Sequence, residues 1–444
     1  MEHAKKLEFD PKASLYEQWS ELANKFDNDY RIHLYAMSKQ FEIIKQSIYG
    51  YSDDRLLVAA AALSAGEGQK AAVMMEADWG TGKTTFGKLA FGFENITQID
   101  KETTANTLRG YVSPIGIGTV VEGTLKGLDD PNKKHMFLNE ATVLGSNPDT
   151  INALFEGPTI KLNGKTVNID GSSILLTGNF PDGRRVKEVD RSLRSRTGAW
   201  LLMGDIDEEG AIARNIAIAR KANEGQEGGV MPFSPIIPAY NIRQSLKEHV
   251  KNRHPLDAEA VGRYVTSLYS ALNSSGLTRE ISLSDARKVE AMYTMARAFK
   301  LVNDVKSATN NPQSIVANPE VSQESRITPL DIAYIAALVL PSEVKFKDSL
   351  YEDLVVAVGK EPNHTEMGVM LRRCLARTAI GVYLDRVVGQ AAPDDEEALR
   401  TQFNQSKKKA AMIDKATFAN IKAVNFNVDD ALDQLQSKQA ERHS

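Results

Sequence analysis

Apolar residues recur at roughly helical spacing in the part of the chain before Gly50. Two such sets follow one another: Tyr16, Trp19, Leu22 and Phe26, and then Ile32, Leu34, Phe41 and Ile44. A face that repeats about every 3.6 residues is typical of an amphipathic helix. The pattern therefore predicts helices here, although it indicates no purpose for them.

From Ala71 onward the hydrophobic pattern changes to short apolar runs. They are separated by stretches that read as helices, and they cover residues 71–75, 135–138, 173–177 and 200–203. Strands that alternate with helices are typical of a mainly parallel sheet covered on both faces. The expected fold class is therefore α/β, with a parallel sheet between two layers of helices.

Composition marks further boundaries along the chain. A stretch rich in glycine and proline from Asn223 to Pro238 is typical of a linker, and the sequence after it reads as helical through Leu340. A polar loop from Ser307 to Ser325 interrupts this helical region. We therefore expect four parts: an N-terminal helical extension (1–45), an α/β core (46–222), a linker with a helical lid (223–344) and a C-terminal helical extension (345–444).

The bulk composition excludes several classes of protein. Of 444 residues, 42% are apolar and 25% are charged, and 54 basic against 58 acidic residues leave a net charge of −4. This balance is ordinary for a soluble globular chain and favours neither a nucleic acid nor a membrane partner. A single cysteine, Cys374, rules out an intrachain disulfide framework and a four-thiolate zinc site. No apolar run is long enough to span a bilayer or to act as a signal peptide, so we expect a cytoplasmic protein without a membrane span.

A glycine-rich loop stands between an apolar run and a potential helix. It reads A-D-W-G-T-G-K-T from Ala77 to Thr84, in the strand, loop and helix context that a P-loop requires. The glycines let successive backbone amides point at phosphate oxygens, Lys83 supplies positive charge to the β- and γ-phosphates, and Thr84 offers a hydroxyl to Mg²⁺. Alanine replaces the first glycine of the usual pattern. The candidate nucleotide-binding residues of this loop are Ala77, Asp78, Trp79, Gly80, Thr81, Gly82, Lys83, Thr84 and Thr85.

Polar residues end the next two apolar runs. Asn139 and Glu140 follow H-M-F-L, where hydrolytic P-loop enzymes place an Asp for the metal's water shell and a Glu that activates water. Glu140 is thus a candidate catalytic base, whereas Asn139 offers the metal an amide oxygen that carries no negative charge. Asn179, after S-I-L-L-T, is a candidate to hold the attacking water or to sense the γ-phosphate. Taken alone, Asn179 would also suit a simple turn.

Three arginines precede the last apolar run of the α/β region. They belong to R-S-L-R-S-R, which spans Arg191 to Arg196 and leads into A-W-L-L-M. An arginine just outside a sheet can reach a phosphate bound by a neighbouring subunit and stabilise the charge that develops during transfer. The same three arginines would also suit a solvated surface.

The order and spacing of these motifs resemble an AAA+ ATPase, and specifically the MoxR family, over about residues 41–344. The most diagnostic stretch is N-P-D-T-I-N-A-L-F-E-G (147–157) followed by T-I-K-L-N-G-K-T-V-N-I (159–169), where the family has a β-hairpin. Asn-Gly between alternating residues is itself a hairpin signal. T-T-A-N-T-L-R-G-Y (103–111) resembles the segment that leads to the family's helix-2 insert, here about 112–126.

The resemblance also implies roles for individual residues. Y-G-Y stands where the family lines its adenine pocket, which implies that Gly50 and Tyr51 contact the base. R-I-T-P-L-D-I resembles the start of a lid helix, with Thr328 as N-cap and Pro329 at the first helical position. The remaining carried-over roles are nucleotide and Mg²⁺ binding for Lys83 and Thr84, water activation for Glu140 and sensor 1 for Asn179.

Two arginine roles are less sharply matched. L-R-S-R-T resembles the family's L-x-x-R-F segment, which makes Arg196 the expected trans-acting finger, with Arg194 and Arg191 as competitors. G-L-T-R-E-I-S-L resembles the family's G-A-S-P-R-A-S-L, but an ungapped match puts Glu280 on the sensor 2 position and Arg279 one residue before it.

The resemblance implies a P-loop AAA+ three-layer sandwich followed by an all-helical lid, acting as an ATP hydrolase with Mg²⁺. A finger that serves only a neighbour implies a homo-oligomer, expected to be a hexameric ring. MoxR-type proteins commonly remodel or assemble a protein client, chaperone-like, with a separate partner that bears a metal-dependent adhesion fold. Two alternatives stay open: a nucleic-acid motor of the helicase kind, with Lys161 and Lys165 on the hairpin as contacts, and a nucleotide-dependent scaffold with little turnover.

Overall fold

A computed structural model describes the parts of the chain that carry the sheet, its hairpins and most of its helices. The described residues are 14–48, 55–67, 71–77, 80–92, 97–99, 110–112, 120–122, 124–130, 135–141, 152–162, 165–179, 191–202, 212, 215–216, 219, 235–282, 286–309, 325–342, 344–347 and 364–383.

A five-stranded parallel sheet forms the centre of the fold. Its order is β2 (Thr97–Ile99), β5 (His135–Leu138), β8 (Ser173–Asn179), β1 (Val73–Ala77) and β9 (Ala199–Leu202). The described side chains of β1, β5 and β8 are all buried, as expected where helices cover a sheet. The four predicted strands are therefore confirmed, with ends displaced by a residue or two. The short edge strand β2 was not predicted, because T-Q-I has too few apolar residues to form a run.

Helices cover both faces of this sheet. Alternate residues of a strand point to opposite faces, so the register places Phe137 on one face and Trp200 on the other. On the first face, Gly87 of α4 (Lys83–Phe91) lies so close that a Cβ there would sit 2.6 Å from the Phe137 ring. On the second face, the Arg194 guanidinium of α7 (Arg191–Arg196) lies 4.6 Å from the centroid of the Trp200 ring. The three-layer sandwich is thereby confirmed.

The chain after residue 235 is helical, as predicted. Its helices are α9 (Tyr240–Arg253), α10 (Ala258–Ser274), α11 (Ala286–Thr309), α12 (Pro329–Val339) and α14 (His364–Tyr383), with the 3₁₀ turn η6 (Leu340–Ser342) after α12. The predicted start of α12 is confirmed, because Thr328 and Asp331 form a capping box and Pro329 occupies the first turn. Most of the predicted linker and of the polar loop lies outside the described residues.

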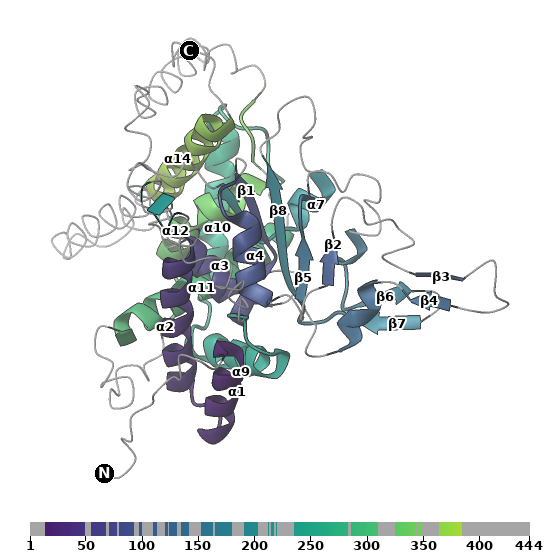
Figure 1. The fold of residues 1–444 in the computed structure, drawn as a ribbon. Coiled ribbons are helices and arrows are strands. Elements are labelled where there is room, and N and C mark those ends of the chain that lie inside the picture. Colours follow the sequence, from purple (N-terminus) through teal and green to yellow (C-terminus); the bar gives the residue numbers. More distant parts are fainter. Residues whose placement is uncertain are drawn as a thin grey trace, which may run out of the picture.

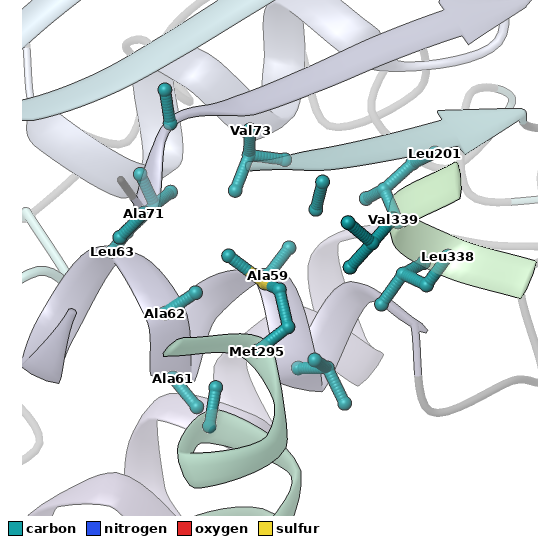
Figure 2. Close-up of a cluster of buried hydrophobic side chains, with 14 of the residues drawn as sticks. Ala59, Ala61, Ala62, Leu63, Ala71, Val73, Leu201, Met295, Leu338 and Val339 are labelled. Atoms are coloured by element: carbon teal, nitrogen blue, oxygen red, sulfur yellow. The ribbon is translucent and has the colours of Figure 1, made fainter. Parts of the chain in front are cut away.

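One buried apolar core joins the sheet to the helical region. Helix α3 (Arg55–Ala65) is rich in alanine and buried along almost its whole length, because small side chains let neighbouring elements approach closely. Figure 2 shows Ala59 of α3 between Val73 of β1, Met295 of α11 and Val339 of α12. The predicted N-terminal helices are present as α1 (Leu15–Lys25) and α2 (Tyr30–Ser47), and α2 packs against α11. Because one core includes buried residues of these helices, of the sheet and of the helical region, packing does not separate the four predicted parts, and the four-part division of the chain stays a prediction.

Two antiparallel hairpins extend from the sheet on the side away from the helical region (Figure 1). The predicted hairpin is confirmed as β6 (Thr159–Leu162) paired with β7 (Lys165–Asn168). In the region of the expected helix-2 insert, β3 (Gly110–Val112) pairs with β4 (Val120–Glu122), and the 3₁₀ helix η2 (Thr124–Asp129) follows. The tips of both hairpins lie outside the described residues.

Two further sequence expectations concern single features. Cys374 of α14 is packed in the core as expected, and burial raises the pKa of its thiol to about 11. Among the described helices, none combines the length and apolarity that crossing a membrane requires.

Candidate functional site

The loop between β1 and α4 has the backbone that a phosphate cradle needs. Gly80 and Gly82 adopt φ of 72° and 89°, in the left-handed region that residues with a Cβ avoid. Gly82 is also the N-cap of α4 and carries no capping side chain, so the first backbone amides of that helix face the loop. An anion at this position would meet amide donors and the positive end of the helix dipole.

Lys83 lies within this loop and not on the surface. Its side chain is 8% exposed, and its ammonium donates to the Ala77 carbonyl oxygen at 2.9 Å and to the Thr81 hydroxyl at 3.3 Å. Both acceptors are neutral loop groups, and phosphate oxygens would bind the same ammonium more strongly because the bond would then be charge-assisted. The lysine is therefore held at the loop in a position from which it can change partners.

Four polar residues meet at the carboxyl ends of β5 and β8. The Asn139 side-chain oxygen accepts from the Thr84 hydroxyl at 3.3 Å and from the Thr177 hydroxyl at 3.0 Å. The Thr177 hydroxyl in turn accepts from the Glu140 backbone N–H at 3.3 Å. Thr84 lies in the first turn of α4, Asn139 and Glu140 directly follow β5, and Thr177 lies near the end of the adjacent strand β8, so the fold brings together residues that are far apart in sequence.

Glu140 and Asn179 complete this edge of the sheet. Glu140 adopts φ of 55°, a conformation that costs of order 1–3 kcal/mol for a residue with a side chain and is typical of functional sites. Asn179 pairs in register with Ala77, the residue that begins the glycine-rich loop, and is 5% exposed. The predicted base therefore directly follows β5 and the predicted sensor ends the adjacent strand β8, at the same edge of the sheet.

The donor set also fits Mg²⁺. This ion takes oxygen ligands at about 2.0–2.1 Å in an octahedron, which puts neighbouring ligand atoms about 3 Å apart. The oxygens of Thr84 and Asn139 are 3.3 Å apart, close to that separation. Both are neutral, so the charge that holds the ion would come from nucleotide phosphates.

The predicted arginines lie at the opposite edge of the sheet. Arg196 precedes β9, whose first residue Ala199 pairs with Val73, the first residue of β1. Because a strand rises about 3.3 Å per residue, β1 separates Arg196 from its own P-loop by roughly 15 Å. Arg196 forms an ion pair with Glu156, and both line a cavity of about 400 Å³ beside α11. Arg196 thus borders a cavity that lies away from the nucleotide cradle of the same chain.

Arg194 lies differently. Its guanidinium stacks over Trp200 and donates to the carbonyl oxygen of Pro341 at 3.0 Å, so it joins the sheet to the turn after α12. Of the two candidates, Arg196 is therefore the one that borders a cavity, and Arg194 is held between the α/β and helical parts. The side chain of Arg191 lies outside the described residues.

Some candidates are not brought to the site by the described structure. Gly50, Tyr51, Asp78 and Trp79 lie outside the described residues. Arg279 and Glu280 are exposed in the turn between α10 and α11, where the Arg279 backbone N–H donates to the Lys345 carbonyl oxygen at 2.8 Å. Their assignment to sensor 2 stays a prediction.

Sequence reasoning missed three residues with evident contacts. Thr177 links Asn139 to Glu140, but a threonine inside an apolar run gives no signal beyond its strand propensity. Glu156 lies within the family-like stretch without having been singled out. Lys288 of α11 is completely buried, although a lysine on a helix ordinarily indicates a solvated face.

Comparison with known proteins supports the fold alone. No family model matches the chain, and no curated protein matches its sequence. A crystal structure of a proposed ATPase from Cytophaga hutchinsonii is similar at a TM-score of 0.50 and 12% identity, covering 75% of this chain and 94% of that one. A full-length MCM homologue from Methanopyrus kandleri reaches a TM-score of 0.36 at 13% identity, covering 72% of this chain and 63% of that one. The first likeness agrees with the P-loop α/β sandwich with helical parts described above.

Proposed function

We propose that this protein is an ATP hydrolase of the AAA+ class. One observation carries the proposal: the P-loop lysine and threonine, the Asn139 amide and Glu140 converge at one edge of a parallel sheet. A phosphate-binding loop alone would suit many proteins. A strained glutamate at the end of the adjacent strand adds the base that hydrolysis needs.

In this mechanism the chain's own residues exchange internal partners for substrate. Lys83 leaves the Ala77 carbonyl oxygen and binds the β- and γ-phosphates, while the amides of the loop surround them. Thr84 and Asn139 are the residues that would hold Mg²⁺, which neutralises charge on the phosphates when bound. Glu140 accepts a proton from the attacking water, and Asn179 orients that water toward the γ-phosphate.

Arg196 acts in this proposal on the nucleotide of a neighbouring subunit. Its position at the amino edge of the sheet, away from its own P-loop, supports a role in trans. Such a role requires that the protein assemble with copies of itself, and we propose a hexameric ring. A guanidinium that reaches the transferring phosphoryl group stabilises its developing charge.

The proposed output is chaperone-like remodelling or assembly of a protein client in the cytoplasm, as in MoxR-type proteins. The two hairpins that extend from the sheet are candidates to contact the client (Figure 1). A separate partner with a metal-dependent adhesion fold belongs to the same proposal, as do adenine contacts by Gly50 and Tyr51 and a sensor 2 role for Arg279.

Specific observations keep the two alternatives in view. The neutral donor set of Thr84 and Asn139 would suit a scaffold that binds nucleotide and turns over slowly. Exposed Lys161 and Lys165 on the hairpin would suit a nucleic-acid motor, which a steep loss of nucleic-acid binding with salt would support.

Phosphate release by the purified protein with ATP and Mg²⁺, measured across protein concentration, tests the proposal. We expect activity to rise with assembly, and both Lys83→Ala and Arg196→Ala to abolish it. Arg196→Ala should still bind ATP, whereas Lys83→Ala should not. Wild-type protein that binds ATP at all concentrations without releasing phosphate would favour the scaffold.

A further inference from the structure

Lys288 fastens the first turn of α11 to the segment that carries Arg196. The Lys288 side chain is fully buried, and its ammonium donates to the Thr197 carbonyl oxygen at 2.7 Å and to the Arg194 carbonyl oxygen at 3.2 Å. These two carbonyls flank Arg196 along the chain at the end of α7. The last carbonyls of a helix lack intrahelical partners, so an ammonium here satisfies them.

Other contacts tie the same segment to the helical region. Arg194 donates in the opposite direction, from the α/β part to the Pro341 carbonyl oxygen of η6 at 3.0 Å. The Arg287 guanidinium approaches the Ser195 hydroxyl at 3.5 Å. Within the turn itself, the Thr197 hydroxyl donates to the Arg194 carbonyl oxygen at 2.8 Å. The backbone on both sides of Arg196 is therefore held by residues of the helical region.

Burying an ammonium costs free energy unless its hydrogen bonds are well made. A buried lysine is therefore not needed merely to pack α11 against α7. An apolar residue could fill the same space, as many do along α11. Unlike an apolar residue, the lysine constrains geometry, because its hydrogen bonds to two carbonyl oxygens fix the position of the turn relative to α11. The side chain of Arg196 leaves from this turn and lines the cavity together with Arg287 and Glu290 of α11.

We propose that Lys288 is a positioning residue for Arg196, through which the orientation of the helical lid sets the reach of this arginine toward the neighbouring subunit's nucleotide. The proposal rests on the trans ATPase proposed above. The positioning role adds to that function the contact through which a lid movement in one subunit changes hydrolysis in the next. Lys288 would thus act on a site that its own subunit does not contain.

Mixed assemblies test this role. Lys288→Met removes the ammonium, and we expect a loss of about 10- to 100-fold in phosphate release with unchanged ATP affinity, since a displacement of about 1 Å can cost that much. Glu140→Gln subunits cannot hydrolyse their own ATP but keep Lys288 and Arg196. Mixed with Lys288→Met subunits, they should restore activity above the sum of the two variants, because each supplies what the other lacks at a shared interface. A purely local folding defect in Lys288→Met would not be repaired by its neighbour.

Matched variants complete the design. Lys300→Met removes another lysine of α11, whose ammonium pairs at 3.1 Å with Asp331 inside the helical region, and it should lower thermal stability without the loss of turnover. Lys288→Arg keeps donors within reach of the carbonyls and should retain most activity. Lys288→Gln keeps a neutral donor and gives the same mixing test if Lys288→Met does not assemble.

The outcomes separate the two proposals. Mixing Arg196→Ala with Glu140→Gln tests trans action by itself. If that mixture recovers activity and the Lys288 mixtures do not, the positioning role is overturned while the trans ATPase stands. If neither mixture recovers activity, both proposals fail.

Discussion

The two edges of the central sheet are built from different interactions. At the carboxyl edge, Asn139 directly after β5 and Thr177 near the end of β8 form a hydrogen bond of 3.0 Å with each other. Each forms a further one of 3.3 Å, Asn139 with the Thr84 hydroxyl and Thr177 with the Glu140 backbone N–H. At the amino edge, buried cations from distant helices bind backbone carbonyls, as Lys288 does at the turn before β9.

Arg243 of α9 repeats this arrangement at the start of β8. It is fully buried and donates to the Gly171 carbonyl oxygen at 2.6 Å and to the Ser173 hydroxyl at 2.8 Å. Burial lowers the pKa of the Arg243 guanidinium to about 10. The neutral hydrogen bonds at the carboxyl edge can be exchanged for those of a ligand, and there the buried Lys83 ammonium can exchange the Ala77 carbonyl oxygen for phosphate oxygens. At the amino edge the buried cations come from distant helices, and their charge-assisted bonds are costly to leave unmade. The comparison indicates that the carboxyl edge is arranged for chemistry and the amino edge for holding the parts of the molecule in place.

The largest expected effect is at the carboxyl edge. Glu140→Gln removes the proposed base, so phosphate release should fall by about 100-fold or more, typical of a lost general base. ATP affinity and thermal stability should stay near those of the wild type, because the Glu140 backbone contact with Thr177 remains. Single-turnover phosphate release and nucleotide titration measure the two effects. Unchanged turnover in Glu140→Gln would contradict the proposed mechanism.

At the amino edge we expect the opposite pattern. Arg243→Met leaves the Gly171 carbonyl and the Ser173 hydroxyl without their charged donor, which should lower the free energy of unfolding by about 2–3 kcal/mol. ATP affinity should not change, because these groups lie at the start of β8 and not at its end.

The matched control for Arg243→Met is an arginine on the surface of α10. Arg263 pairs with Glu259 and its side chain is 80% exposed, so Arg263→Met should cost less than about 0.5 kcal/mol. Urea denaturation with and without nucleotide makes both measurements. Equal losses in the two variants would erase the distinction drawn between the edges.

The smallest expected effect sharpens the role of Asn139. Asn139→Asp places a carboxylate 3.3 Å from the Thr84 hydroxyl, so half-maximal hydrolysis should need several-fold less Mg²⁺, roughly 1 kcal/mol in binding. The maximal rate at saturating Mg²⁺ should rise little if Glu140 already serves as base. A Mg²⁺ titration of both proteins checks this, and a large rise in maximal rate would instead indicate that Asn139 limits turnover in the wild type.

Local sequence patterns were sufficient to predict much of the fold and the P-loop part of the candidate site. The buried strands, the Asn-Gly hairpin and the start of α12 could be predicted because each depends on neighbouring residues. The P-loop was recognisable for the same reason, since its glycines, Lys83 and Thr84 are consecutive or nearly so. The short strand β2 escaped, because it is defined by pairing with β5 and not by its own composition.

The sequence by itself determined which residues could bind a nucleotide, because phosphate binding depends on backbone conformation and charge within one loop. Only the tertiary structure decided that Thr177 joins Asn139 to Glu140, and that Arg194 and Arg196 have different surroundings. It also decided that Lys288 is buried against the turn before β9. The physical reason is the same in each case. A polar residue on a helix or strand looks the same in the sequence whether its side chain contacts water or a carbonyl of a distant segment, and only the packing of those segments determines which contact it makes.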